Sequence, residues 1–210
     1  MKRRLTLGGP AVPLSALVDE PGQALCALVL AHGAGAGMDH PFMDALAAGL
    51  RERGAATLRF QFPFMERGTR RPDAPEVAQA AIRCALQTAQ AQWPGLPLFA
   101  GGKSFGGRMA TQLQSREPWP GLCGIVLFGF PLHPAGKPST SRAGHLAQVH
   151  CPMLFLQGTR DALADLPLIR DVVGPLPPAE LHVIEGADHS FHVPARSGRA
   201  DRGVVAELGP

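Results

Sequence analysis

The sequence lacks long apolar runs, closely spaced cysteine pairs and extended stretches of one charge. No apolar segment reaches the roughly 18 residues that a membrane-spanning helix needs. The stretch from Leu5 to Leu17 is interrupted by glycines and prolines, so it lacks the continuous apolar core of a secretion signal. We therefore expect a cytoplasmic protein with no membrane partner.

Basic residues are dispersed along the chain. The formal net charge is +3 at pH 7, yet the longest basic run is Lys2 to Arg4. Binding to a phosphate backbone usually relies on a stripe of basic side chains. We therefore expect no nucleic-acid partner.

The four cysteines are Cys26, Cys84, Cys123 and Cys151. They are widely spaced, form no C-x-x-C pair and lie mostly in or beside apolar runs. This pattern favours buried thiols in a reducing compartment over disulfides.

The length of 210 residues suits a single domain spanning residues 1–210. Short apolar runs alternate with longer helix-compatible segments, which predicts a doubly wound α/β domain with a mostly parallel sheet. The runs are almost uninterrupted, as expected for strands covered on both faces. The predicted strands are 25–30, 56–60, 97–101, 124–128, 152–157 and 181–184, and the predicted helices are 42–53, 75–92, 105–116 and 165–173. A weaker helix is predicted within 197–208, where two glycines interrupt the pattern.

The segment 131–144 is rich in proline and glycine, which predicts a loop. About fourteen residues are too few to build a lid domain, so we expect a site that is open or closed only by loops.

The strongest motif is Gly102-Lys103-Ser104-Phe105-Gly106, a G-x-S-x-G between a predicted strand and a predicted helix. Small residues permit the tight turn that raises the serine hydroxyl above the sheet. The free amides of the following helix would face a developing negative charge. Ser104 is therefore the candidate nucleophile, and the alternative is a glycine-rich helix entry.

A carboxylate and an imidazole follow later strands in the expected order. Asp161 comes just after the strand 152–157, and His189 follows the strand 181–184. Carboxyl ends of parallel strands share one rim of a sheet. We predict that His189 takes the proton of Ser104 while Asp161 fixes the imidazole tautomer.

Other residues could fill these roles. Asp161 could instead be a turn or capping residue, with Asp165 as the acid, although Asp165 is better placed to cap the next helix. His192 could replace His189 as the base, but His189 follows the strand more directly. A metal site at the two histidines lacks further ligands at suitable spacing, so we expect no metal and no cofactor.

A glycine-rich loop follows the first predicted strand at His32-Gly33-Ala34-Gly35. Its position matches the loop that donates one oxyanion-hole amide, which makes Ala34 and Phe105 the candidate donors. A dinucleotide-binding motif would need glycine where Met38 stands, and a phosphate-binding P-loop would need one at Pro97.

The segment after the second predicted strand carries Phe62, Phe64 and Arg67. The aromatic rings could line an acyl pocket and the cation could attract an acidic substrate. The alternative is that the rings lie in the core and the arginine is solvated. We expect the Lys103 side chain to point away from the serine.

With these motifs assembled, the chain resembles the small, lidless α/β-hydrolases of the dienelactone-hydrolase-like kind, in the subgroup that includes testis-expressed relatives. The resemblance rests on 32–35, 60–64, 102–108, 130–133, 158–161 and 188–189. It implies a compact α/β-hydrolase fold without a lid domain. It also implies a triad of Ser104, Asp161 and His189, with serine where true dienelactone hydrolases carry cysteine.

The first functional hypothesis is a serine hydrolase for a small ester, thioester or lactone, whose partner is a small-molecule acyl substrate. The second is a noncatalytic binding or assembly module, because fold does not determine function. For either one we expect a monomer or a homodimer.

Overall fold

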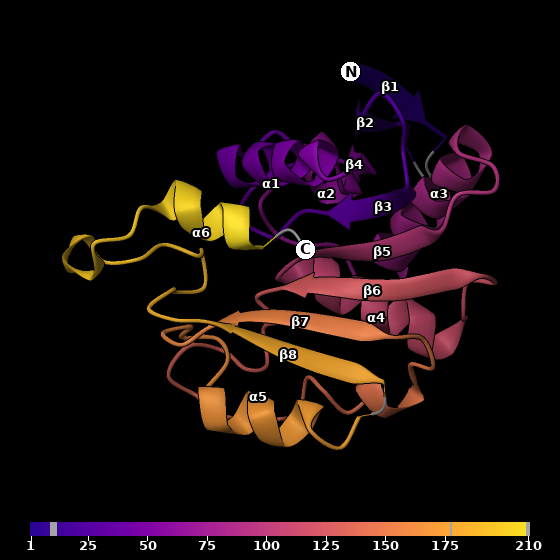
Figure 1. Cartoon of the computed structure of the whole chain (residues 1–210). Coiled ribbons are helices and arrows are strands. Elements are labelled where there is room, and N and C mark those ends of the chain that lie inside the picture. The colour runs from indigo at the N-terminus through magenta and orange to yellow at the C-terminus, as the bar shows by residue number, and fades with distance from the viewer. Residues whose placement is uncertain (9–11, 177, 209–210) are drawn as a thin grey trace.

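The computed structural model describes residues 1–8, 12–176 and 178–208, which form one eight-stranded sheet flanked by helices (Figure 1). The strand order is β1-β2-β4-β3-β5-β6-β7-β8. The strands are β1 (Lys2–Leu7), β2 (Leu14–Asp19), β3 (Cys26–Ala31), β4 (Ala55–Phe60), β5 (Leu98–Lys103), β6 (Leu122–Phe128), β7 (Met153–Gly158) and β8 (Ala179–Ile184). Strands β3 to β8 are parallel, whereas β2 pairs antiparallel with both β1 and β4.

The helices divide between the two faces of the sheet (Figure 1). They are α1 (Pro41–Glu52), α2 (Pro63–Glu66), α3 (Pro75–Gln92), α4 (Phe105–Arg116), α5 (Leu166–Val173) and α6 (Asp201–Glu207), with 3₁₀ turns at Leu146–Gln148 and Ala195–Ser197. One hydrophobic cluster joins the sheet to α3, α4 and α5, and a second joins it to α1 and α6. Among the described residues, no helix is both long and apolar enough to cross a membrane.

The predicted mostly parallel, doubly wound sheet without a lid domain is confirmed. Each of the six predicted strands and four predicted helices is present, with ends that differ by at most two residues. Segment 131–144 contains neither helix nor strand. The weaker C-terminal prediction corresponds to α6, which begins only at Asp201.

The hairpin of β1 and β2 was not predicted. Exposed and partly buried residues alternate along most of β1, as expected for a strand at the edge of a sheet. This alternation gives no continuous apolar run, so the strand lacks the pattern that predicts the buried strands.

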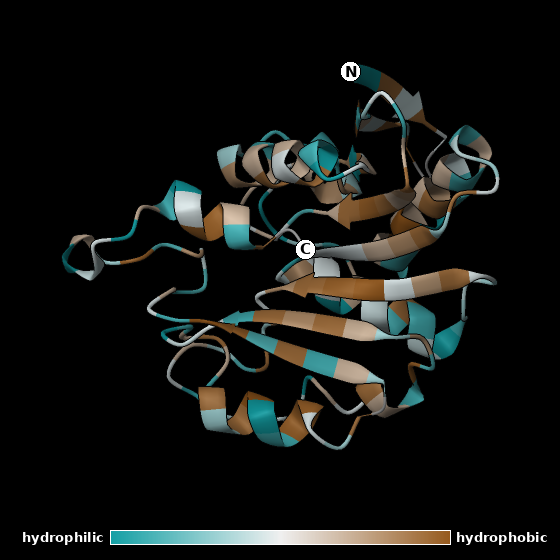
Figure 2. Cartoon of the chain, viewed as in Figure 1, coloured by the Kyte–Doolittle hydropathy of each residue, from teal (hydrophilic) through white to brown (hydrophobic). Residues whose placement is uncertain are grey.

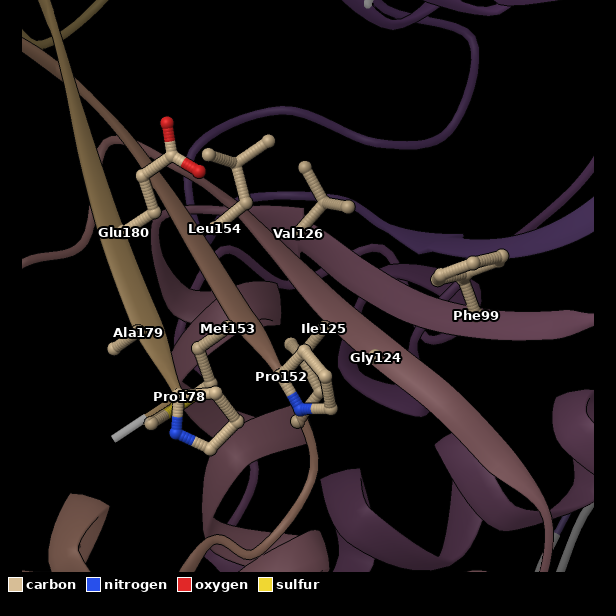
Figure 3. Close-up of a pocket in the computed structure, with 10 residues that line it drawn as sticks. All are labelled: Phe99, Gly124, Ile125, Val126, Pro152, Met153, Leu154, Pro178, Ala179 and Glu180. Carbon is tan, nitrogen blue, oxygen red and sulfur yellow. The ribbon is translucent and has the colours of Figure 1, made fainter. Parts of the chain in front are cut away.

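The expectation that both faces are covered is only partly met on the side of the sheet opposite α5. There α6 packs with Phe128, Leu156 and Ile184, near the carboxyl ends of β6, β7 and β8. Farther back, β8 alternates between exposed and partly buried residues, and hydrophilic and hydrophobic residues alternate along it (Figure 2). A hollow of about 460 Å³ lies here, where Val126, Leu154 and Glu180 point to the same side (Figure 3). None of its lining residues is a serine, cysteine or histidine.

The cysteines are only partly as expected. The structure leaves all four as free thiols, but Cys151 is the only one that is buried and Cys123 is exposed. Cys123 lies in β6, near the uncovered part of the sheet.

A fully buried arginine joins the hairpin, the sheet and α1. Arg59 of β4 donates to Asp19 of β2 and to Asp44 of α1, each over 2.6 Å. It also donates to the carbonyl of Met38, in the loop that leads into α1. A buried guanidinium needs such partners because its desolvation is costly.

We expect Asp19→Ala to lower the free energy of unfolding by about 3 kcal/mol, because it leaves a buried cation without one of its two carboxylates. Asp39→Ala is the control, since Asp39 pairs with Arg4 at the exposed surface. That change should cost less than about 0.5 kcal/mol. Urea denaturation measures both, and equal losses would contradict the structural role of Asp19.

Candidate functional site

The turn between β5 and α4 holds Ser104 in a strained conformation. Its φ is 50° and its ψ is −111°, values that residues other than glycine rarely adopt. The Ser104 amide donates to the carbonyl of Phe128 over 3.0 Å, which ties the turn to the end of β6. Ser104 is the only residue between the two elements, because β5 ends at Lys103 and α4 begins at Phe105.

The glycines of the motif are required by close backbone approach. A methyl group added to Gly102 would lie 2.4 Å from the carbonyl oxygen of Ala31, and one added to Gly106 would lie 2.6 Å from the same atom. Both distances are much shorter than a van der Waals contact. The atom in the way belongs to the backbone of Ala31, so it cannot move aside as a flexible side chain could. The small residues therefore allow α4 to pack directly against β3.

The structure brings the three predicted catalytic residues together. His189 Nε2 lies 2.9 Å from Ser104 Oγ, and His189 Nδ1 lies 2.7 Å from Asp161 Oδ2. The Asp161 side chain is fully buried, whereas 22% of the His189 side chain is exposed. Each residue follows the carboxyl end of a parallel strand, namely β5, β7 and β8.

Two further donors fix the carboxylate. Gln157 Nε2 donates to Asp161 Oδ2 over 2.5 Å, and the amide of Leu163 donates to Oδ1 over 2.7 Å. Gln157 is itself held, since its Oε1 accepts from the amide of Phe130. With both oxygens engaged, Asp161 has little freedom to turn away from His189.

The sequence does not predict that Gln157 belongs to the site. It lies in an apolar strand, and nothing in the local pattern indicates that its partner is four residues further along. A polar side chain inside a strand with buried neighbours is the one signal that could have identified it.

The alternative acid and base lie elsewhere. Asp165 occupies the N-cap position of α5, without a side-chain capping bond, and its amide donates to His133 Nε2. His192 Nδ1 lies 2.7 Å from Asp201 Oδ2, and that hydrogen bond raises the pKa of the exposed His192. The described residues contain no group of three His, Cys, Asp or Glu side chains arranged to hold a metal ion.

A cavity of about 430 Å³ adjoins Ser104 and His189. The glycine-rich loop after β3 and the start of α1 form one side of it, and predicted oxyanion donor Ala34 is part of this wall. Phe105, the other predicted donor, is the first residue of α4. Helices leave their first amides without intrahelical partners, so the Phe105 amide is available at the site. The full lining is Gly33, Ala34, Gly35, Ala36, His40, Phe42, Met43, Lys103, Ser104, Leu163, His189 and Ser190.

The structure does not bring the three predicted substrate-binding residues to this cavity. Phe62 and Phe64 are completely buried in the core, where their rings pack edge-on against Phe105. Arg67 is exposed and pairs with Asp73. The expectation of a substrate contact is therefore wrong for Phe62 and Phe64, because the hydrophobic effect places the two rings behind the nucleophile turn. For Arg67, which does not line this cavity, it stays a prediction.

His32 holds the glycine-rich loop in place. Its Nδ1 lies 2.7 Å from the carbonyl oxygen of Gly33, and its Nε2 accepts from the amide of Phe62. This arrangement requires a neutral ring protonated on Nδ1. Burial lowers the pKa of His32 to about 4, and hydrogen bonds from the ring to the backbone of Gly33 and Ala36 oppose this shift more weakly.

We expect acid to destabilise the protein partly through His32. The folded state keeps this ring neutral down to about pH 4, while the unfolded chain binds a proton near pH 6.5. The unfolded state therefore holds more protons in this window, and stability is lost as the pH falls through it. For His32, the loss between pH 7 and pH 5 is on the order of 2 kcal/mol.

Urea denaturation of the wild type and of His32→Gln at both pH values tests this expectation. The variant should lose less stability on acidification than the wild type. His145 remains in both proteins and contributes equally, because burial, Arg108 and Arg116 lower its pKa to about 4 as well. An identical loss in the two proteins would show that His32 is not responsible.

Comparison with known proteins agrees with this architecture. The chain superposes on a serine hydrolase homologue from Coxiella burnetii with a TM-score of 0.77 and 21% identity, covering 99% of this chain and 97% of that one. A lidless α/β serine hydrolase from Xanthomonas campestris gives 0.76 and 24%, covering 99% and 93%. A dienelactone hydrolase from Anabaena variabilis gives 0.78 and 22%, covering 99% and 94%.

These structural likenesses establish the fold. The sequence family described as Alpha/beta hydrolase domain matches residues 24–208, which include every residue of the site. The match leaves out residues 1–23, which contain the N-terminal hairpin, and the last two residues. With that match over most of its length, the chain belongs to the α/β-hydrolase family.

Proposed function

We propose that the protein is a serine hydrolase that cleaves a small ester, thioester or lactone through an acyl-enzyme on Ser104. The observation that carries the proposal is the continuous hydrogen-bonded series Ser104–His189–Asp161 beside a cavity. A hydroxyl, a base and an orienting carboxylate in this order form the machinery of nucleophilic acyl transfer.

In the first half of the reaction, His189 Nε2 accepts the proton of Ser104 as Oγ attacks the substrate carbonyl. Asp161 holds Nδ1–H and stabilises the positive charge that the ring gains. The imidazolium then gives its proton to the departing oxygen or sulfur, and the acyl group stays on Ser104. In the second half, His189 takes a proton from water, which attacks the acyl group; the imidazolium then returns that proton to Ser104 Oγ as the acid leaves.

The negative oxygen of each tetrahedral intermediate needs hydrogen-bond donors. The amide of Phe105 is the first candidate, because it opens the twelve-residue helix α4 beside the nucleophile. The amide of Ala34 is the second, since Ala34 lines the same cavity. A methyl group added to the neighbouring Gly33 would lie 3.8 Å from Ser104 Cβ, so the loop passes close to the serine.

The cavity supports a small and partly apolar substrate. Phe42, Met43 and Leu163 contribute apolar side chains, and its volume of about 430 Å³ suits a small molecule. The loop 131–144 builds no lid over it, so access does not require a domain to open.

We expect Ser104→Ala to abolish hydrolysis of short-chain nitrophenyl esters, lowering kcat/KM by at least about a thousandfold, because no nucleophile remains. Ser141→Ala is the matched control, since Ser141 is exposed in the loop 131–144 and does not line the cavity. That variant should keep its activity. Equal rates for the wild type and Ser104→Ala would rule out the proposal and favour a noncatalytic module.

We expect Gln157→Leu to lower kcat by about tenfold, because Asp161 loses a donor and is less firmly directed at His189. Gln114→Leu serves as the control. It removes another buried glutamine, which accepts a hydrogen bond from the amide of Trp119 and lies at the opposite end of α4 from Ser104. Steady-state kinetics, with unfolding midpoints measured alongside, would distinguish a role in positioning Asp161 from a purely structural role. If both variants lose the same activity, Gln157 has only a structural effect.

A further inference from the structure

The ammonium group of Lys103, next to the nucleophile, has no evident structural partner. Part of the residue lines the cavity, but its Nζ is buried and forms no hydrogen bond to the described residues. A buried and unpaired ammonium is costly, so its presence beside a reactive site calls for a physical reason.

The ammonium lies close to the His189 ring. A methyl group placed on Gly129 would be 3.0 Å from Lys103 Nζ and 3.5 Å from both Nδ1 and Cε1 of His189. Lys103 Nζ and the His189 ring are therefore separated by no more than the sum of the distance to Nζ and the distance to the ring. Gly129 leaves this space open, and its φ of 68° also favours glycine.

An aromatic ring covers the ammonium. Lys103 Nζ lies 5.6 Å from the centre of the Phe191 ring, which stacks on Phe42. Phe191 holds a φ of 62°, a strained value for a bulky residue. The strained residue, Phe191, is therefore the one whose ring lies over the Lys103 ammonium.

The charged and titratable groups around His189 come from four segments. Asp161 follows β7 and contacts the ring, Asp188 precedes it in its own turn, Lys103 ends β5, and His40 lines the cavity from the start of α1. Burial lowers the pKa of Lys103 to about 8, while Asp161 and Asp188 oppose that shift. At neutral pH, Lys103 is therefore mostly charged.

We propose that Lys103 is a positioning residue whose positive charge keeps His189 free of a proton in the resting enzyme. This inference rests on the proposed function. Asp161 alone favours a protonated ring, and a protonated His189 cannot accept the proton of Ser104. The positive charge of Lys103 lies near the ring and opposes that protonation without contact with the substrate.

The pH dependence of kcat/KM for a short-chain nitrophenyl ester distinguishes this role from simple packing. Lys103→Met keeps an unbranched apolar stem but removes the charge. At pH 6.5 its kcat/KM should be several-fold lower than the wild type, approaching about tenfold at lower pH, because the acid limb moves to higher pH by about one unit. Above pH 9 the two profiles should converge, since wild-type Lys103 is then uncharged as well.

Lys137→Met is the matched control, because Lys137 is exposed in the loop 131–144. Its profile should follow the wild type. A Lys103→Met deficit of equal size at every pH, or an unchanged profile, would overturn the proposal.

A second measurement does not depend on turnover. The His189 Cε1–H signal in NMR spectra, assigned by its loss in His189→Gln, reports ring protonation directly. At pH 6.5 the protonated fraction should be larger in Lys103→Met than in the wild type. If the wild type hydrolyses no ester, the proposed function fails, yet this comparison still tests the effect of Lys103.

The wild type alone supplies a test if Lys103→Met does not fold. Its His189 signal should show a second, smaller inflection near pH 8, as Lys103 loses its proton. The absence of that inflection would show that the ammonium does not act on the ring. Where Lys103→Met does fold, identical titrations of the two proteins would show the same.

Discussion

The close packing of the β5–α4 turn against β3 is the constraint on which the site depends. The backbone around Gly102 and Gly106 approaches Ala31 so closely that no side chain fits between them. Ser104 is thereby forced into a left-handed, strained conformation, and its hydroxyl is directed toward His189. Strain of this kind persists only where the surrounding structure determines the backbone, as the sheet does here.

The rest of the site is a set of buried polar contacts that remove freedom from each group. Gln157 fixes Asp161, Asp161 fixes His189, and His32 fixes the glycine-rich loop. Such networks are costly when incomplete and rigid when satisfied. The exception is Lys103, whose buried ammonium has no hydrogen bond to the part of the chain that the structure describes and acts through charge in our account.

The sequence predicts most of the parallel sheet and the proximity of Ser104, Asp161 and His189, because each follows an apolar strand and such strand ends share one rim. It does not predict Gln157, whose partners depend on how the loops fold. The assignment of Phe62 to the substrate pocket was wrong, since local sequence does not reveal which side of the nucleophile turn a ring occupies. The membership of the narrower testis-expressed subgroup stays a prediction.

Covalent labelling with a fluorophosphonate tests most directly whether Ser104 is an activated nucleophile. The reagent phosphonylates a serine only where a neighbouring base raises its reactivity. Digestion and mass spectrometry should locate the added mass on the peptide that contains Ser104, with little label in His189→Ala. A folded wild-type protein that takes up no label, or takes it up equally without the imidazole, would contradict the account.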